Sequence, residues 1–330
     1  MGFPVLIDAL SSADGPRAVR QHAHYNVCSH HAMPVARGNG QLDLLCRKGG
    51  NEFVCPYHGW RYRANGRLRE ARQIKGIKDF RARDYGLKPI HVDTLGQLIF
   101  VNFAPGPEPP MSLREWADPL QRELRDVGGL GAADGDEDGA GRLVHVRRRV
   151  YPIDCNWKVF VDNYCDGGYH VPYAHEALAE GIDMSTYSTD LFPRVSVQSV
   201  SGGEEEQGAE DERLGRGAGY AFLYPNFMVN RYGPWMDTNT VLPRGVDACD
   251  VVFDWFVEPE LAQDAAYLEE SLAASDVVQE EDHELCVGVQ QGYSSRAYVQ
   301  GRFVPQFEAP MHHFHSLLRA DYAAHLGMAD

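Results

Sequence analysis

The chain has 330 residues, of which 44% are hydrophobic and 24% charged, a balance typical of an ordered globular protein with room for about two domains. Its formal net charge of −16 argues against nucleic acid or an anionic membrane as a partner. Apolar runs are too short to cross a bilayer, and no secretory signal or transit peptide is visible. The odd count of seven cysteines indicates reduced thiols or metal ligands, so we expect a soluble, intracellular protein.

Short strand-like runs separated by turn dipeptides fill the first third of the chain. Asn39-Gly40, Gly49-Gly50 and Asn65-Gly66 indicate hairpins, and Gly96–Asn102 reads as a closing strand. We predict a small all-β domain over residues 1–105.

A linker is expected over residues 106–142. Ser112 and Glu115 form a capping box that predicts a helix of about 14 residues. The glycine-rich, acidic stretch 127–142 has almost nothing to bury and is predicted to be a surface loop.

Residues 143–330 are predicted to form a larger mixed domain, which makes the fold class α+β. A second acidic tract, 204–212, is read as a solvated loop. The expected elements are strands at Val144–Tyr151, Tyr220–Val229 and Asp250–Val257 and a long helix from about Leu261 to Tyr293.

Two short clusters in the first block each combine one cysteine with one histidine: Cys28-Ser-His30 and Cys55-Pro-Tyr-His58. A zinc finger usually separates its cysteines from its histidines, whereas a Rieske [2Fe–2S] cluster needs one thiolate and one imidazole from each loop. A Rieske cluster bound by these four residues is therefore the favoured interpretation, and structural zinc is the alternative. Cys46, between the clusters, is read as a plain core thiol.

A second constellation, Asp162–His175, contains a pair of histidines five residues apart. Pro172 breaks any regular helix between His170 and His175, so the chain can bend and bring both rings together. Two imidazoles and one carboxylate are the ligand set of non-haem Fe(II) oxygenases. From the long C-terminal helix we favour Asp282 as the carboxylate, with Glu281 as the alternative.

The order of these motifs resembles the catalytic alpha subunits of Rieske-type oxygenases. The resemblance rests on C-x-H, CPYHGW, Asn156-Trp-Lys158 and the histidine pair, and it covers nearly the whole chain. Within that family the second block is similar to the choline-hydroxylating enzymes of plants, through DNYCDGGYHVPYAHE from Asp162 and YAFLYPNFMVNRYGPWMDTN from Tyr220.

This resemblance implies a Rieske domain followed by a helix-grip (START-like) catalytic domain with an antiparallel sheet and a long C-terminal helix. It also implies a mononuclear Fe(II) held by His170, His175 and Asp282, reduced ferredoxin or a similar acidic donor, and O2. A homotrimer in the chloroplast stroma is expected by the same analogy. By the same comparison, the Arg47–Asn51 stretch is expected to be an insertion between the cluster ligands, and the Rieske block is expected to lack the usual N-terminal strands.

Many relatives place an aspartate three residues before the first iron histidine, where it links the two metal sites across a subunit interface. Gly167 occupies that position in this chain. A carboxylate is wanted there to accept the imidazole N–H, and Asp166 or Asp162 are the candidates. Asn163 is counted with them in the same catalytic cluster.

Basic residues are concentrated in the Rieske block despite the acidic total. Eleven Lys and Arg lie between Arg47 and Arg83 against three acids, Glu52, Glu70 and Asp79. Such a patch would steer an acidic ferredoxin to the cluster. The alternative is an ordinary solvated β surface.

The predicted function is ferredoxin-dependent hydroxylation of choline to betaine aldehyde. Aromatic faces attract a trimethylammonium group, and we select Tyr232 and Trp235 from the aromatic-rich stretch 220–235 as candidate contacts. The alternatives are another quaternary amine such as carnitine or glycine betaine, an aromatic ring, or an electron-transfer protein without catalytic iron.

Overall fold

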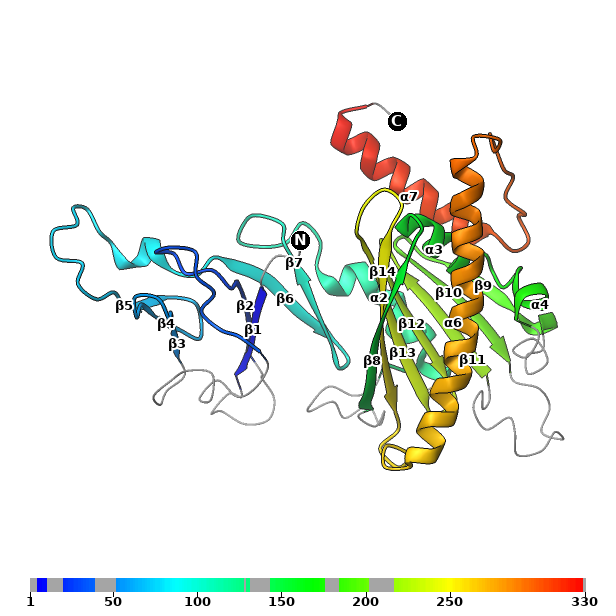
Figure 1. Cartoon of the computed structure of the whole chain (residues 1–330), viewed down its shortest axis with the longest axis horizontal. Helices are drawn as coiled ribbons and strands as arrows, with labels where there is room; N and C mark the ends of the chain where they lie inside the picture. Colours follow the sequence, from blue (N-terminus) through cyan, green and yellow to red (C-terminus); the bar gives the residue numbers. More distant parts are fainter. Residues whose placement is uncertain are drawn as a thin grey trace. The chain divides into compact units, whose positions relative to one another are not determined.

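The computed structural model describes residues 5–10, 20–38, 52–127, 129–130, 143–175, 184–201 and 217–328 (Figure 1). The chain divides into two compact units, Met1–Leu113 and Arg114–Asp330. Within the described ranges, no helix is both long enough and apolar enough to cross a membrane. The predicted hairpins at Asn39-Gly40 and Gly49-Gly50, Cys46, tract 204–212 and nearly all of stretch 127–142 lie outside these ranges.

The first unit is built from two antiparallel sheets in its described part, in agreement with the predicted β character. The turn expected at Asn65-Gly66 joins two strands of the smaller sheet, and Gly66 adopts a positive φ of 76° there. The larger sheet has the order β1 (Val5–Leu10), β2 (Arg20–Tyr25), β6 (Pro89–Leu95), β7 (Leu98–Asn102), and the smaller has the order β3 (Glu52–Val54), β4 (Arg61–Arg63), β5 (Leu68–Glu70), followed by the short η1 (Ala82–Tyr85).

In the described residues of the second unit, a seven-stranded antiparallel sheet forms the centre. Every neighbouring pair in it is antiparallel. Its order is β8 (Val144–Ile153), β14 (Cys249–Val257), β13 (Trp235–Pro243), β12 (Phe227–Tyr232), β11 (Gly217–Leu223), β10 (Val195–Ser201), β9 (Ser188–Leu191).

Helices cover one face of this sheet. The long helix α6 (Ala265–Ser294) runs along it, and α3 (Trp157–Tyr164) contacts both α6 and β13 (Figure 1). The architecture confirms the predicted α+β class with a long C-terminal helix. The remaining helical segments are α2 (Leu113–Glu123), η2 (Arg125–Val127), α4 (Val171–Ala174), η3 (Met184–Thr186) and α7 (Ala309–Leu326).

The single strand predicted at Tyr220–Val229 is wrong, because the chain reverses in its middle. Leu223 pairs with Phe227, so β11 and β12 are joined by a tight turn that contains Pro225. Proline has no N–H for a strand ladder, which ends the first strand there. The apolar pattern is continuous because the strands on both sides of the turn are buried.

The register of the central strands gathers polar residues on one face of the sheet. Tyr220 lies opposite Asn230, Asn230 opposite Asp237, and Asn239 opposite Phe253. Directly paired residues, and residues two apart on a strand, point to the same side. These five side chains therefore face the same way, and four of them line the cavity described below.

Candidate active site

The two Cys-His clusters of the first unit lie on loops with the same backbone pattern. The Cys28 amide donates to the Met33 carbonyl and that of Ala32 to Cys28, and the Cys55 amide donates to Trp60 and that of Gly59 to Cys55. The fifth residue of each loop is left-handed, with φ of 59° at Ala32 and 70° at Gly59. The loops therefore hold the two cysteines at equivalent positions, with His30 two residues and His58 three residues after its cysteine.

The four candidate ligands on these loops differ in solvent exposure. Cys28 and Cys55 are each 2% exposed, whereas His30 and His58 are exposed and their ring centroids are 4.6 Å apart. Trp60 stacks on His30 at 4.7 Å. Two buried sulfurs and two solvent-facing imidazoles are the donor set that a Rieske cluster requires.

Tyr62 supports the buried side of this site. Its hydroxyl lies 3.1 Å from Cys28 Sγ and accepts a hydrogen bond from the Ser29 amide. Burial raises the pKa of Cys55, and the neighbouring Cys28 thiol raises it further. Thiolates at these positions thus need a cationic centre, which the irons of the cluster would supply.

The basic patch is only partly available to a partner. Arg61 lies within ion-pair distance of Glu52 and Glu70, and Arg69 and Arg72 pair with the same two acids. Lys75 and Lys78 are exposed. Arg63 and Arg67 are exposed as well. Of the described basic residues of the patch, these four are the better candidates for contact with an acidic protein.

In the second unit, His170 and His175 lie at the two ends of the one-turn helix α4. Gly167 and Gly168, with φ of 72° and 75°, turn the chain after α3 and deliver it to His170. Pro172 sits in the first turn of α4, where no intrahelical N–H is needed. The two Nε2 atoms are consequently 3.1 Å apart, so the rings converge.

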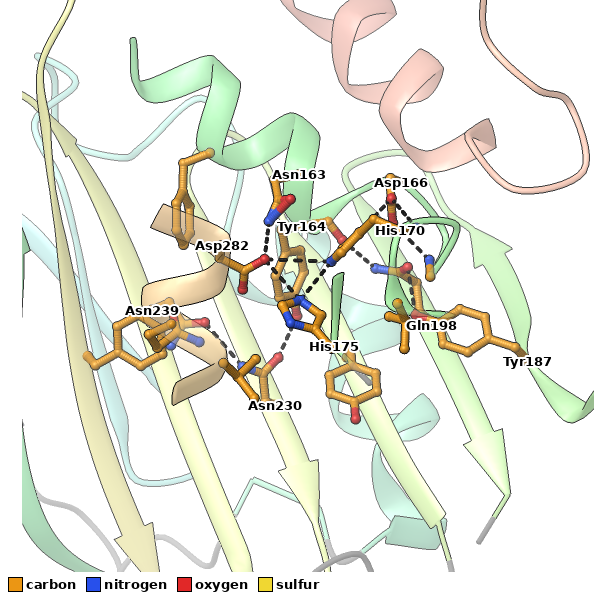
Figure 2. Close-up of a pocket in the computed structure, with 17 residues that line it drawn as sticks. Asn163, Tyr164, Asp166, His170, His175, Tyr187, Gln198, Asn230, Asn239 and Asp282 are labelled. Carbon is orange, nitrogen blue, oxygen red and sulfur yellow. Dashed lines mark hydrogen bonds and ion pairs between the residues drawn. The ribbon is translucent and has the colours of Figure 1, made fainter. Parts of the chain in front are cut away.

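Asp282 of α6 completes a three-residue cluster with this pair (Figure 2). Its Oδ1 lies 3.2 Å from His175 Nε2 and 3.6 Å from His170 Nε2. One ligand atom from each residue lies within 4.8 Å of the others, close enough to hold one metal ion. Two imidazoles and one carboxylate fit mononuclear Fe(II).

Each of the three candidate ligands is held by a further side chain. His170 Nδ1 donates to Asp166 at 2.5 Å, His175 Nδ1 to Glu281 at 2.6 Å, and Asn163 Nδ2 to Asp282 at 2.5 Å. Nδ1–carboxylate contacts leave each Nε2 for a metal and fix the ring orientation. Glu281, the alternative ligand, thus contacts a histidine, while Asp282 faces both rings.

Asp166 and Asp162, the two candidates for a bridging carboxylate, have different surroundings. Asp166 also accepts from the backbone amides of Gly168 and His170, at 2.9 Å each. Asp162 instead lies 2.8 Å from His315 Nε2 on α7. Of these two aspartates, only Asp166 contacts an iron-site histidine in the described part of the chain.

The carboxylates around the histidine pair favour its protonated form in the metal-free protein. Burial alone lowers the pKa of His170, but hydrogen bonds to Asp166 and Asp282 outweigh it and raise the pKa to about 9. Burial likewise lowers the pKa of His175, and Asp282 and Glu281 raise it above its usual value.

A bound metal has to displace these protons, which predicts pH-dependent metal affinity. His170 alone should make affinity rise roughly tenfold per pH unit and level off above its pKa of about 9. Titration of the metal-free protein with Co(II), followed by its visible absorption at several pH values, measures this. An affinity that is flat between neutral pH and pH 9 would contradict the prediction.

A cavity of about 130 Å³ opens beside the three-residue cluster. Its lining combines aromatic rings with amide side chains (Figure 2). Tyr164 donates to Asn230 Oδ1 at 2.7 Å, and Gln198 accepts from Tyr187 at 2.9 Å. Besides the candidate ligands, the described side chains that line it are Phe160, Asn163, Tyr164, Asp166, Val171, Tyr187, Gln198, Tyr220, Asn230, Asn239, Phe253, Val278 and Gln279.

Tyr232 and Trp235, the candidate substrate contacts, are not part of this lining. Trp235 is 1% exposed and donates from Nε1 to Tyr267, and Tyr232 donates to Asp237. The strand register instead places Asn230, Asp237 and Asn239 on the helix-covered face of the sheet, and sequence reasoning did not select these residues. Polar side chains in otherwise apolar strands were the available signal.

Comparison with known proteins agrees with both units. Residues 17–81 match the Rieske [2Fe–2S] domain, and residues 140–324 match the ring hydroxylating alpha subunit catalytic domain. The chain is 47% identical over 300 residues, or 90% of its length, to the chloroplastic choline monooxygenase of Arabidopsis thaliana. It is 38% identical over 94% of its length to that of Atriplex hortensis. It spans 68% and 66% of these relatives' own length.

Among solved structures, the quaternary ammonium Rieske monooxygenase CntA superposes with a TM-score of 0.74 at 22% identity. The match covers 96% of this chain and 81% of that one. Naphthalene 1,2-dioxygenase from Rhodococcus sp. gives a TM-score of 0.67 at 17% identity, covering 92% and 81%. These similarities reflect a shared fold. With its Rieske domain, its mononuclear iron catalytic domain and its close relatives, the chain belongs to the ring-hydroxylating alpha subunits and is a Rieske non-haem iron oxygenase.

Proposed function

We propose that this oxygenase is a monooxygenase that hydroxylates choline at its carbinol carbon. The observation that carries the proposal is 47% identity, over 90% of the chain, to a choline monooxygenase. Hydroxylation at this carbon consumes O2, two electrons and two protons, and gives water and the hydrate of betaine aldehyde.

The cavity suits a quaternary ammonium group, which cannot donate a hydrogen bond. Aromatic side chains are attracted to quaternary ammonium groups at about 0.5–2 kcal/mol each, and Phe160, Tyr164, Tyr187, Tyr220 and Phe253 line the site. Its described lining contains no lysine or arginine to pair with a carboxylate. This favours choline over carnitine or glycine betaine, which carry one.

His170, His175 and Asp282 would hold the catalytic iron, which when bound supplies the activation of O2. Asp166 and Glu281 keep the imidazole Nε2 atoms directed at the metal position, and Asn163 does the same for Asp282 Oδ1. The aromatic lining would exclude bulk water and place the carbinol carbon near that position.

Electrons would enter at the cluster held by Cys28, His30, Cys55 and His58. By analogy with the family we propose an acidic donor such as ferredoxin, and a homo-oligomer, with a trimer favoured, in which Asp166 links one subunit's cluster to its neighbour's iron site. The Arabidopsis and Atriplex relatives are chloroplastic, and we propose the same compartment here.

Reversing the charge of Lys75 and Lys78 together should raise the apparent KM for ferredoxin several-fold at low salt. Both side chains are exposed and belong to the unit that contains the two Cys-His loops. Reversing their charge removes the long-range attraction that they exert on an acidic donor. Steady-state assays at two ionic strengths measure the effect. The matched control is Lys88→Glu, an exposed lysine outside this stretch, and equal KM values for both variants would contradict a local docking role.

A single-turnover experiment tests the proposed function. The reduced protein is mixed with O2 in the presence of choline, carnitine or glycine betaine, and products are identified by mass spectrometry. We expect betaine aldehyde from choline and little product from the other two amines. No product from choline would refute the assignment, and about two rather than about three iron atoms per chain would favour an electron carrier.

A further inference from the structure

One amide side chain of the cavity has no hydrogen-bond partner among the described residues. Five of the described side chains that line the cavity are amides: Asn163, Gln198, Asn230, Asn239 and Gln279. Asn163 is bonded to Asp282, as described above. Gln279 lies on α6 and is half-buried, and within the described ranges nothing donates to its side chain or accepts from it.

The other three amides are held at both ends by protein groups. Gln198 donates to the Tyr164 carbonyl and accepts from the Tyr187 hydroxyl, each at 2.9 Å. Asn230 and Asn239 each donate from Nδ2 and accept at Oδ1 within the strand network (Figure 2). A ligand that used one of these amides would have to break a bond within the protein, whereas Gln279 can bind a ligand without losing a described partner.

Gln279 also lies close to the metal position along α6. It precedes Asp282 by three residues, and residues three apart on a helix share a face. Both side chains line the cavity. Three residues of helix rise about 4.5 Å, so a group bound to the Gln279 amide is placed next to the carboxylate ligand.

We propose that the Gln279 amide oxygen accepts the hydrogen bond of the substrate hydroxyl and so determines which carbon faces the iron. The inference rests on the proposed choline activity and deepens it. Choline has a trimethylammonium end that cannot hydrogen-bond and an alcohol end that can. With the aromatic rings on the ammonium group and Gln279 on the hydroxyl, the carbinol carbon is fixed near Asp282 and the N-methyl groups are turned away from it.

Gln279→Met removes the amide and keeps the length and flexibility of the side chain. Binding of choline and of ethyltrimethylammonium to the iron-loaded enzyme is measured by calorimetry without O2. The second ligand has the same charge and lacks only the hydroxyl. We expect the variant to bind choline about three- to tenfold more weakly, the equivalent of one neutral hydrogen bond, and to bind ethyltrimethylammonium as the wild type does.

Two further variants control this comparison. Gln291→Met makes the same change at an exposed position of α6 outside the cavity lining, and it should leave both affinities unaltered. Gln279→Glu keeps the size of the side chain and an oxygen acceptor. Because both ligands carry the same charge, the added attraction cancels in the ratio of their affinities, and this variant should restore the preference for choline.

The products of choline oxidation give a readout that a purely structural role would not move. Hydroxylation at an N-methyl group consumes O2, two electrons and two protons like the main reaction and forms a carbinolamine. Its C–N bond then breaks, the nitrogen keeps the electron pair, the hydroxyl proton leaves, and formaldehyde is released. Because Gln279→Met no longer fixes the alcohol end, the ratio of formaldehyde to betaine aldehyde should rise several-fold.

Three outcomes overturn the inference while leaving the proposed function in place. They are an equal change, or no change, in both affinities of Gln279→Met, an unchanged product ratio, and a choline preference in Gln279→Glu no greater than in Gln279→Met. A wild-type enzyme that forms no product from choline overturns the proposed substrate, and the inference with it.

Discussion

Replacing His175 with alanine should abolish hydroxylation and lower the iron content from about three to about two atoms per chain, with the visible absorption of the Rieske cluster unchanged. His175 is 2% exposed and its Nε2 lies 3.2 Å from Asp282. Alanine leaves two of the three candidate ligands and removes the imidazole that Glu281 orients. The iron would therefore be held by too few protein atoms to stay bound. Product analysis, iron determination and the visible spectrum measure the three consequences.

The converse variant tests whether the two metal sites are independent. His58→Ala should remove the visible absorption and about two irons per chain, while about one iron remains bound in the second unit. His325→Ala, an exposed histidine near the end of α7, is the neutral control. Loss of the Rieske spectrum in His175→Ala would show that the ligands of the two sites have been confused.

The local motifs were predictable because each is complete within a few residues. Cys28 and His30, and likewise Cys55 and His58, carry their spacing in the sequence, and loop hydrogen bonds within each motif suffice to shape it. The bend at Pro172 was also predictable, since proline constrains its own neighbourhood. The α+β class followed from the change from turn-rich strands to a long helical pattern.

The cavity could not be predicted in the same way, because it depends on strand register. Asn230 and Asp237 become neighbours only through a tight turn, and Phe253 reaches Asn239 from the next strand. The aromatic stretch suggested Tyr232 and Trp235 by composition. The register buries Trp235 beside Tyr267 and ties Tyr232 to Asp237, while Tyr164 and Tyr187 come to the cavity from outside the stretch.

The absence of an aspartate at position 167 has a steric explanation. Gly167 has a φ of 72°, and a Cβ on it would lie 2.0 Å from the Phe307 carbonyl oxygen. No side chain fits against that backbone atom. The carboxylate that orients His170 therefore comes from Asp166, one residue earlier, which also caps the turn through the amides of Gly168 and His170.

Gly167→Ala should consequently lose catalytic iron and reduce choline hydroxylation by roughly ten- to a hundredfold or more, as when a residue that orients a metal ligand is lost. Because the clash is with a backbone carbonyl, the Asp166–His170 turn has to move, and His170 moves with it. Iron content, activity and the Rieske spectrum are compared with those of Gly288→Ala. That glycine lies in α6, the helix of Asp282, and a Cβ there meets nothing within 4 Å. The control should keep its iron and gain up to about 1 kcal/mol of helix stability, whereas full iron occupancy in Gly167→Ala would show that the turn tolerates a side chain and that its geometry does not set the position of His170.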